Sequence, residues 1–161
     1  MRLDLDRTPP GGSTLLVAED LALLEGSLPA AVRLEGELAV DNLGKRFLVR
    51  GDLVARGRGE CGRCLAEFEL TYPVPVEIMI LRGGEQEGED EGEHLVIHQR
   101  TGEVDLDDAL RESAILAVPL VTVCDQDCRG LCIQCGADLN RGPCTCDPES
   151  PDPRWEGLPD A

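Results

Sequence analysis

The stretch Phe68-Glu69-Leu70-Thr71-Tyr72-Pro73-Val74-Pro75-Val76-Glu77-Ile78-Met79-Ile80 decides the fold of this chain. Apolar or aromatic side chains occupy every even-numbered position for seven steps, which is the period of a β-strand with one buried face. Pro73 and Pro75 fall on the opposite parity and have no N–H group to donate to a sheet. We therefore expect a long strand that lies at a sheet edge or whose pairing is locally interrupted.

Alternation of the same kind runs through residues 32–53. Apolar side chains recur on one parity up to Val40, residues 41–46 have the composition of a turn, and the alternation resumes at Phe47. This pattern predicts a β-hairpin. Residues 13–24 show no clear period, so a short helix and an irregular segment both remain open for them.

Residues 105–118 carry a helical pattern of apolar and small side chains. Asp105 is a candidate N-cap, two further aspartates suit the first turn, and Pro119 ends the helix. A short strand at residues 120–123 is expected to lead into a block of cysteines. The fold class that follows is α+β: an antiparallel β-meander of four to six strands, with one main helix and a C-terminal cysteine-rich zinc ribbon.

The domain organisation follows from composition. Residues 1–123 are expected to form a mostly antiparallel β domain with one helix, and residues 124–161 a cysteine-rich zinc-binding tail docked on this core. Residues 83–93 contain glycine and polar residues without any apolar one, which predicts a mobile acidic loop. No secretory signal is recognisable, and no run approaches the roughly 18 apolar residues of a membrane span. We therefore expect a cytoplasmic protein without a membrane partner.

Eight cysteines in four close pairs are the main clue to function. Zinc binds four sulfur ligands in a tetrahedron, and one Cys-x-x-Cys turn supplies two of them, so eight thiols suit two closed zinc sites. Gly62 and Gly136 allow positive φ angles in the two Cys-x-x-Cys turns. Redox thiols, disulfides and an iron–sulfur cluster are the competing interpretations. The candidate metal ligands form the Cys61 pair (Cys61, Cys64), the Cys124 pair (Cys124, Cys128), the Cys132 pair (Cys132, Cys135) and the Cys144 pair (Cys144, Cys146).

Distance along the chain favours one way of sharing these ligands between two zinc ions. Eight residues separate the Cys132 pair from the Cys144 pair, enough for a small loop that returns to the same ion. The Cys61 and Cys124 pairs would then share the other ion and join the middle of the chain to its later part. The rival partition, which places the Cys124 and Cys132 pairs on one ion, remains open.

The formal net charge of −17 restricts the choice of partners. Such a surface repels phosphate at long range, and four aromatic residues are too few for a platform that stacks single-stranded RNA. Residues 28–64, however, contain seven basic and five acidic residues. A local contact with RNA therefore remains open beside the more ordinary interpretation of solvated strand faces. The candidate RNA contacts are Arg50, Arg56, Arg58 and Arg63.

A catalytic zinc site is not expected. Such a site keeps an open coordination position for water, whereas four cysteines close the tetrahedron. Neither His94 nor His98 belongs to a His-Glu-x-x-His motif. The sequence therefore predicts a protein that is not an enzyme.

Residues 128–140 read Cys-Arg-Gly-Leu-Cys-Ile-Gln-Cys-Gly-Ala-Asp-Leu-Asn, and the Cys144 pair and the run Asp-Pro-Arg-Trp-Glu-Gly-Leu at 152–158 follow. Together they resemble the C-terminal signature of the bacterial YceD family. The preceding order of a basic strand region, a Cys-x-x-Cys turn, an acidic loop and a helix is similar as well. The resemblance implies a non-enzymatic role in ribosome biogenesis, supporting accumulation or processing of the large-subunit (23S) ribosomal RNA precursor in bacteria and plastids.

The acidic charge bears on how such a role would be performed. A protein this acidic is better suited to hold a basic ribosomal protein or assembly factor, within ribosomal precursor particles, than to coat RNA. Direct contact with 23S ribosomal RNA through the four arginines is the alternative. A different class of function, a thiol-based redox or zinc-release switch, also remains open.

Overall fold

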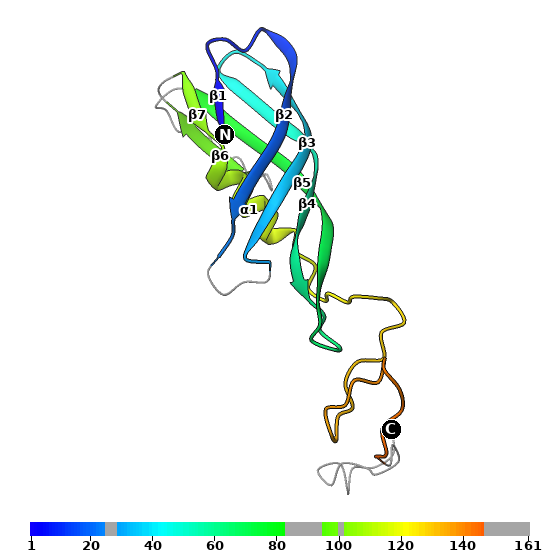
Figure 1. Cartoon of the computed structure of the whole chain (residues 1–161). Coiled ribbons are helices and arrows are strands. Elements are labelled where there is room, and N and C mark those ends of the chain that lie inside the picture. The colour runs from blue at the N-terminus through cyan, green and yellow to red at the C-terminus, as the bar shows by residue number, and fades with distance from the viewer. Residues whose placement is uncertain (25–28, 83–94, 100–101, 147–161) are drawn as a thin grey trace, which may run out of the picture.

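The computed structural model describes residues 1–24, 29–82, 95–99 and 102–146. The acidic run 83–93 and the motif at 152–158 lie outside these residues, so the predicted mobile loop is not tested. The main element is a five-stranded sheet with the strand order β2-β3-β4-β5-β6 (Figure 1). Its strands are β2 (Gly11–Ala22), β3 (Ala31–Asn42), β4 (Arg46–Glu60), β5 (Glu67–Arg82) and β6 (Leu95–Gln99). A two-stranded sheet pairs β1 (Arg2–Asp4) with β7 (Glu103–Asp105), and one helix, α1, spans Asp107–Leu116.

The sheet confirms the predicted antiparallel meander. Strands β2, β3, β4 and β5 are neighbours in chain order, and each pairs antiparallel with the next. The predicted hairpin is β3–β4. Strand β6, which follows residues 83–94, pairs with β5 in the parallel direction. This parallel addition was not foreseen, because a meander connection would return the chain antiparallel.

Strand β5 behaves as the proline positions predict. Its register with β4 runs unbroken through Pro73 and Pro75, opposite Val54 and Asp52. Strand β6 pairs only with the last part of β5, from Ile78 onward. Among the described residues, the side of β5 that faces away from β4 therefore has no strand partner at the prolines. The ladder survives because the two missing N–H groups belong on that open side.

Strand β2 resolves the segment that the sequence left open. Val17 is 3% exposed whereas the adjacent Leu16 is 72% exposed, so an apolar side chain stands on the solvent face. This exposed leucine hides the period of two on which strand recognition depends.

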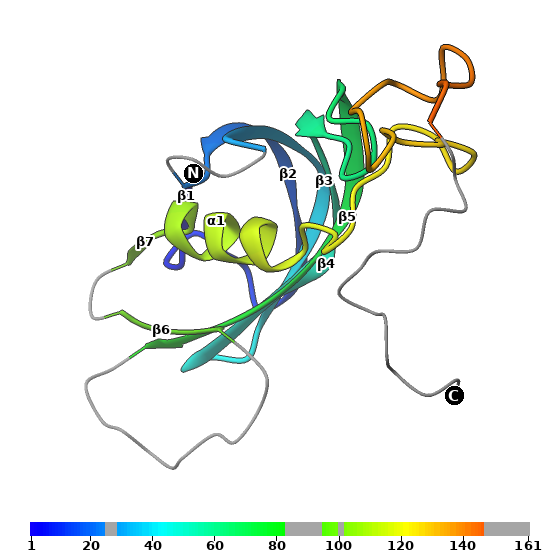
Figure 2. The same cartoon turned by 90° about the horizontal axis from the view of Figure 1, so that it is seen from below.

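Helix α1 lies in the concave face of the curved sheet (Figure 2). Its buried side packs against the sheet, and the Tyr72 hydroxyl of β5 donates a hydrogen bond to the Ala114 carbonyl at 3.2 Å. The predicted N-cap was one residue early, because Leu106 occupies that position. Asp105 still contributes, since its carboxylate accepts a hydrogen bond from the N–H of Asp107 at 3.0 Å.

The predicted strand at residues 120–123 is wrong. These residues adopt no strand, and Leu120 and Val121 are exposed. Their apolar character suggested a strand, yet the segment meets the end of the sheet through hydrogen bonds of Thr122. Its hydroxyl donates to the Glu60 carbonyl at 2.7 Å, and its own carbonyl accepts the N–H of Gly62 at 2.8 Å. Within the described part of the chain, no helix has the length and apolar character needed to cross a bilayer.

Candidate metal centres

Four thiols meet where the β4–β5 hairpin turns, and they form the first cluster. The Cys61 pair lies in the turn between the two strands, and the Cys124 pair lies in the segment that follows α1. The Cys61 and Cys128 Sγ atoms are 3.8 Å apart, and the Cys64 and Cys124 Sγ atoms are 3.7 Å apart. All four Sγ atoms lie within 4.8 Å of one another. A tetrahedron with Zn–S bonds of about 2.3 Å has S···S edges of about 3.8 Å, so the cluster has the dimensions of a zinc site.

The Cys132 and Cys144 pairs form the second cluster, whose four Sγ atoms also lie within 4.8 Å of one another. The structure thus groups the thiols in the two sets that chain distance favoured, and it does not group them in the rival way. The two clusters differ in burial. Cys61 and Cys128 are buried in the first, whereas no cysteine of the second is buried.

Both Cys-x-x-Cys turns are built by the same backbone hydrogen bonds. In the first, the Cys61 N–H donates to the Ala66 carbonyl and the Leu65 N–H donates to the Cys61 carbonyl, both at 2.9 Å. In the second, Cys132 and Gly136 repeat these two bonds at 2.8 Å. Each turn therefore folds back on its first cysteine and presents both sulfurs to one side.

The residue after the second cysteine of each turn has a positive φ angle. This residue is Gly136 in the second turn, with φ of 71°, and Leu65 in the first, with φ of 59°. Gly136 was predicted correctly, but Gly62 is not among the residues with positive φ. Leu65 was missed because leucine rarely adopts this conformation. Aligning the two turns on their cysteines would have revealed it, since Leu65 stands where the second turn has glycine.

The electrostatics of the bare thiols favour a cation. In the first cluster, backbone hydrogen bonds from Cys124 and Cys64 lower the pKa of the Cys61 thiol to about 6. Hydrogen bonding to the neighbouring thiols, Cys64 foremost, raises the pKa of Cys124 to about 12. The second cluster repeats this division: backbone bonds from Cys135 and Gln134 lower the pKa of Cys132 to about 6, and Cys135 foremost raises that of Cys146 to about 12. Four thiolates repel one another unless a divalent cation binds between them, so the donor sets fit a thiophilic metal.

Arg63 joins the first turn to the cysteine-bearing segment. Its guanidinium donates to the carbonyls of Gln126 at 3.2 Å and Cys128 at 2.9 Å, and its own carbonyl accepts the Leu131 N–H at 3.0 Å. Gly130 permits this approach, because a Cβ atom there would lie 2.9 Å from the Arg63 carbonyl oxygen. Arg63 was a candidate RNA contact in the sequence. The structure shows it bound to the protein's own backbone.

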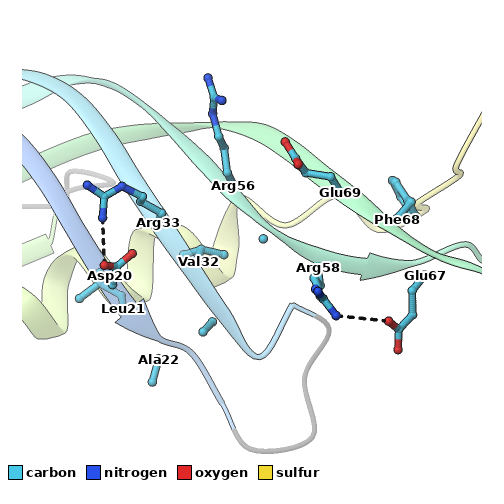
Figure 3. Close-up of a pocket in the computed structure, with 12 residues that line it drawn as sticks. Asp20, Leu21, Ala22, Val32, Arg33, Arg56, Arg58, Glu67, Phe68 and Glu69 are labelled. Carbon is cyan, nitrogen blue, oxygen red and sulfur yellow. Dashed lines mark hydrogen bonds and ion pairs between the residues drawn. The ribbon is translucent and has the colours of Figure 1, made fainter.

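The other candidate arginines lie on the strand faces, and two of the three are ion-paired. Arg50 pairs with Asp41 at 2.9 Å, and Arg58 approaches Glu67 at 3.8 Å, whereas Arg56 has no ion pair among the described residues. Arg56 and Arg58 line a groove of about 870 Å³ across the ends of β2, β3, β4 and β5 (Figure 3). Three carboxylates balance the three guanidinium groups of this groove, which are those of Arg33, Arg56 and Arg58. The groove therefore carries no net positive charge for a phosphate.

Fold and clusters define a mostly β protein that carries two tetracysteine groups suited to metal ions. A family model described as "Large ribosomal RNA subunit accumulation protein YceD" matches residues 49–160. The chain belongs to the YceD family.

Similar proteins come from bacteria and from plants. An uncharacterized protein of Mycobacterium tuberculosis is 31% identical over 140 residues, which make up 87% of this chain and 65% of that protein. The Arabidopsis thaliana protein named "Large ribosomal RNA subunit accumulation protein YCED homolog 1, chloroplastic" is 25% identical over 144 residues, or 72% of this chain and 45% of that protein. This chain thus spans less than two thirds of the length of these relatives. No solved structure matches it significantly.

Proposed function

We propose that the chain binds one zinc ion in each cluster and acts as a non-enzymatic factor that supports accumulation or processing of the large-subunit ribosomal RNA precursor. Membership of the YceD family supports the role with ribosomal RNA. The sulfur distances of 3.7 and 3.8 Å in the first cluster carry the assignment of zinc. In this proposal the protein is cytoplasmic, residues 1–123 are the scaffold, which supplies Cys61 and Cys64, and residues 124–161 are the cysteine-rich tail, which supplies the other ligands.

The geometry favours closed structural sites over the other metal chemistries. Four cysteine ligands complete a tetrahedron, which leaves no position for the water that a hydrolytic zinc activates. A cluster of two or four irons inserts several atoms between its thiolates and holds them farther apart than one ion does. The Sγ atoms of each group lie within 4.8 Å of one another, as a single ion requires.

Metal analysis of the protein tests this assignment directly. Protein purified under reducing conditions should contain about two zinc ions per chain, and Cys61→Ser and Cys132→Ser should each remove about one. A native protein that contains one zinc or none, or that contains iron instead, would contradict the proposal.

The charge distribution favours a basic protein as the immediate partner. The formal net charge is −17, the groove in Figure 3 is balanced, and Arg63 is bound to backbone carbonyls. A basic ribosomal protein or assembly factor within precursor particles complements this surface better than 23S ribosomal RNA does.

Two charge variants separate these partners. The first replaces the acids of residues 83–93 by their amides, and the second combines Arg56→Gln with Arg58→Gln. If the partner is a basic protein, the first variant should associate more slowly with precursor particles and show a weaker salt dependence, because charges at an interface rim act mainly on association. If RNA is contacted directly, the second variant should lose retention on filters and the first should bind as well as the native protein. Arg63 is excluded from the set because of its structural contacts.

The exposed thiols of Cys124 and Cys135 favour a second candidate, a redox or zinc-release switch. Exposed thiolates react with oxidants more readily than buried ones. Titration with hydrogen peroxide, followed by thiol counting and detection of released zinc, measures this directly. A switch should release zinc reversibly at low oxidant and change its association with precursor particles, whereas a structural site should do neither.

A further inference from the structure

Asn140 belongs to the loop of the second cluster, yet its side chain contacts a sulfur atom of the first. It lies between the Cys132 and Cys144 pairs, and its Nδ2 atom is 3.5 Å from Cys128 Sγ. Cys128 is a member of the first cluster. A side chain held by one candidate metal centre therefore donates a hydrogen bond to a ligand of the other.

The orientation of this amide follows from its other partners. Its Oδ1 atom accepts the N–H of Arg129 at 2.8 Å, and a backbone N–H can only donate. The Nδ2 group is thereby turned toward Cys128 and toward Asp138, whose carboxylate accepts from it at 2.8 Å. The same carboxylate accepts the Asn140 N–H at 3.0 Å. Both the oxygen and the nitrogen of the side-chain amide thus have hydrogen-bond partners, which fix its orientation.

Backbone hydrogen bonds join the segment that links the two clusters to the segment that carries Asn140. The Leu139 N–H donates to the Gly130 carbonyl at 2.9 Å, and Leu131 and Asp138 form an isolated antiparallel bridge. Residues 128–131, which link the clusters, therefore pack against residues 138–140. The position of Asn140 depends on the loop that a metal in the second cluster would close.

We propose that Asn140 is a positioning residue for Cys128 and that it couples the two metal centres, so that loss of the second metal weakens retention of the first. The inference rests on the zinc binding proposed above. An N–H···S bond takes up part of the negative charge of a metal-bound thiolate and holds the sulfur in place. Removing such an outer partner commonly lowers metal affinity by about 10- to 100-fold.

Zinc release to a chromogenic chelator tests the positioning role. The phase that belongs to the first cluster is identified as the one that Cys61→Ser abolishes. Asn140→Asp keeps an oxygen for the Arg129 N–H but replaces the donor that faces the sulfur, so we expect release from the first cluster to become about tenfold faster. Ile133→Ser, a change at a fully exposed position in the Cys132-x-x-Cys135 turn of the same cluster, is the control and should release both ions at native rates. Equal first-cluster rates in Asn140→Asp and the native protein would overturn the proposal.

Substitution of cobalt for zinc adds a spectroscopic measurement, which reports on the metal–sulfur bonds and does not change when the loop merely becomes less stable. Loss of an N–H···S bond raises the energy of the sulfur lone pair, so the thiolate-to-cobalt charge-transfer band of the first cluster should shift to lower energy in Asn140→Asp. The comparison uses both proteins carrying cobalt in both centres. An unchanged band would assign Asn140 to the folding of the loop alone.

A double-mutant cycle tests the coupling. Cys144→Ser should accelerate release from the first cluster, and adding Asn140→Ala should accelerate it little further, because the displaced loop has already withdrawn the amide. Additive effects would show that the centres are independent. If the native protein holds two zinc ions and the cycle is additive, this inference fails while the proposed zinc binding stands. If it holds no zinc, both fail.

Discussion

The sheet and the cysteine region, residues 122–146, are held together by different forces. Every one of the buried apolar residues in the core cluster lies at or before Ala114, in a strand, in α1 or directly beside one of these elements. In the cysteine region, by contrast, Cys128 is the single buried apolar residue among those described. The first region is thus stabilised by removal of apolar surface from water, and the second has thiols where a core would otherwise be. One chain therefore contains two parts that should respond to different perturbations.

Metal removal should separate the two regions most strongly. Binding of a structural zinc by thiolates contributes about 10 kcal/mol or more to folding, because the site does not exist in the unfolded chain. Stripping zinc with a strong chelator should therefore abolish hydrogen-exchange protection in the cysteine region and leave β2, β3 and α1 protected. Hydrogen exchange with mass spectrometry, before and after chelation, measures this. Protection that persists in the cysteine region would mean that this region does not depend on metal for its structure.

The two clusters should differ when one ligand of each is removed. Cys61→Ser should expose the ends of β4 and β5 as well as the cysteine region, because the first cluster joins the hairpin to the segment after α1. Cys144→Ser should act mainly on residues 131–146. Comparing deuterium uptake of the two variants shows the extent of each effect. Identical uptake maps confined to the cysteine region would contradict the cross-linking role of the first cluster.

Truncation of a side chain in the hydrophobic core should destabilise the sheet and leave metal binding intact. Leu53 is fully buried in β4, so Leu53→Ala should lower the free energy of unfolding of the sheet by about 2–5 kcal/mol. Its zinc content should stay native, since no metal ligand is touched. Urea unfolding gives the first quantity and elemental analysis the second. Loss of zinc from this folded variant would show that the regions are not separable.

The smallest expected effect concerns the two Cys-x-x-Cys turns. Leu65 is exposed and has a φ of 59°, a conformation that costs a leucine about 1 kcal/mol. Leu65→Gly should therefore stabilise the first turn by about 0.5–1 kcal/mol. Gly136→Ala is the matched change in the second turn, where no atom lies within 4 Å of an added Cβ, and it should destabilise by a similar amount. Chelator competition on each variant measures both changes. Shifts of the same sign would show that backbone strain is not their cause.

Local patterns predicted the elements whose side chains alternate cleanly. β3, β4 and β5 bury one parity almost without exception, and that is the signal read from the sequence. The strand expected at residues 120–123 failed for the opposite reason. Its apolar residues resemble a strand, but a strand also needs a neighbour, and Leu120 is fully exposed. Pairing partners are set by the whole fold, and a run of four residues does not encode them.

The grouping of the cysteines could be predicted because chain distance limits which ligands reach one ion. The residues that organise the clusters could not. Arg63 and Asn140 act through contacts that arise only after the hairpin and the cysteine region meet. In the sequence, Arg63 looks like any basic residue of an acidic chain and Asn140 like any turn residue.

The separation of ligands along the chain also sets an order of events during synthesis. Cys135 and Cys144 are nine positions apart, so the second cluster can close as soon as it leaves the ribosome. Cys64 and Cys124 are 60 positions apart, and closing so long a loop in an unfolded chain costs about 2 kcal/mol more by the logarithmic dependence on loop length. The Cys61 pair emerges first and must wait as a half-filled site until the sheet and α1 have folded and delivered its partners. A fully ligated first cluster would therefore report that the sheet and α1 have folded.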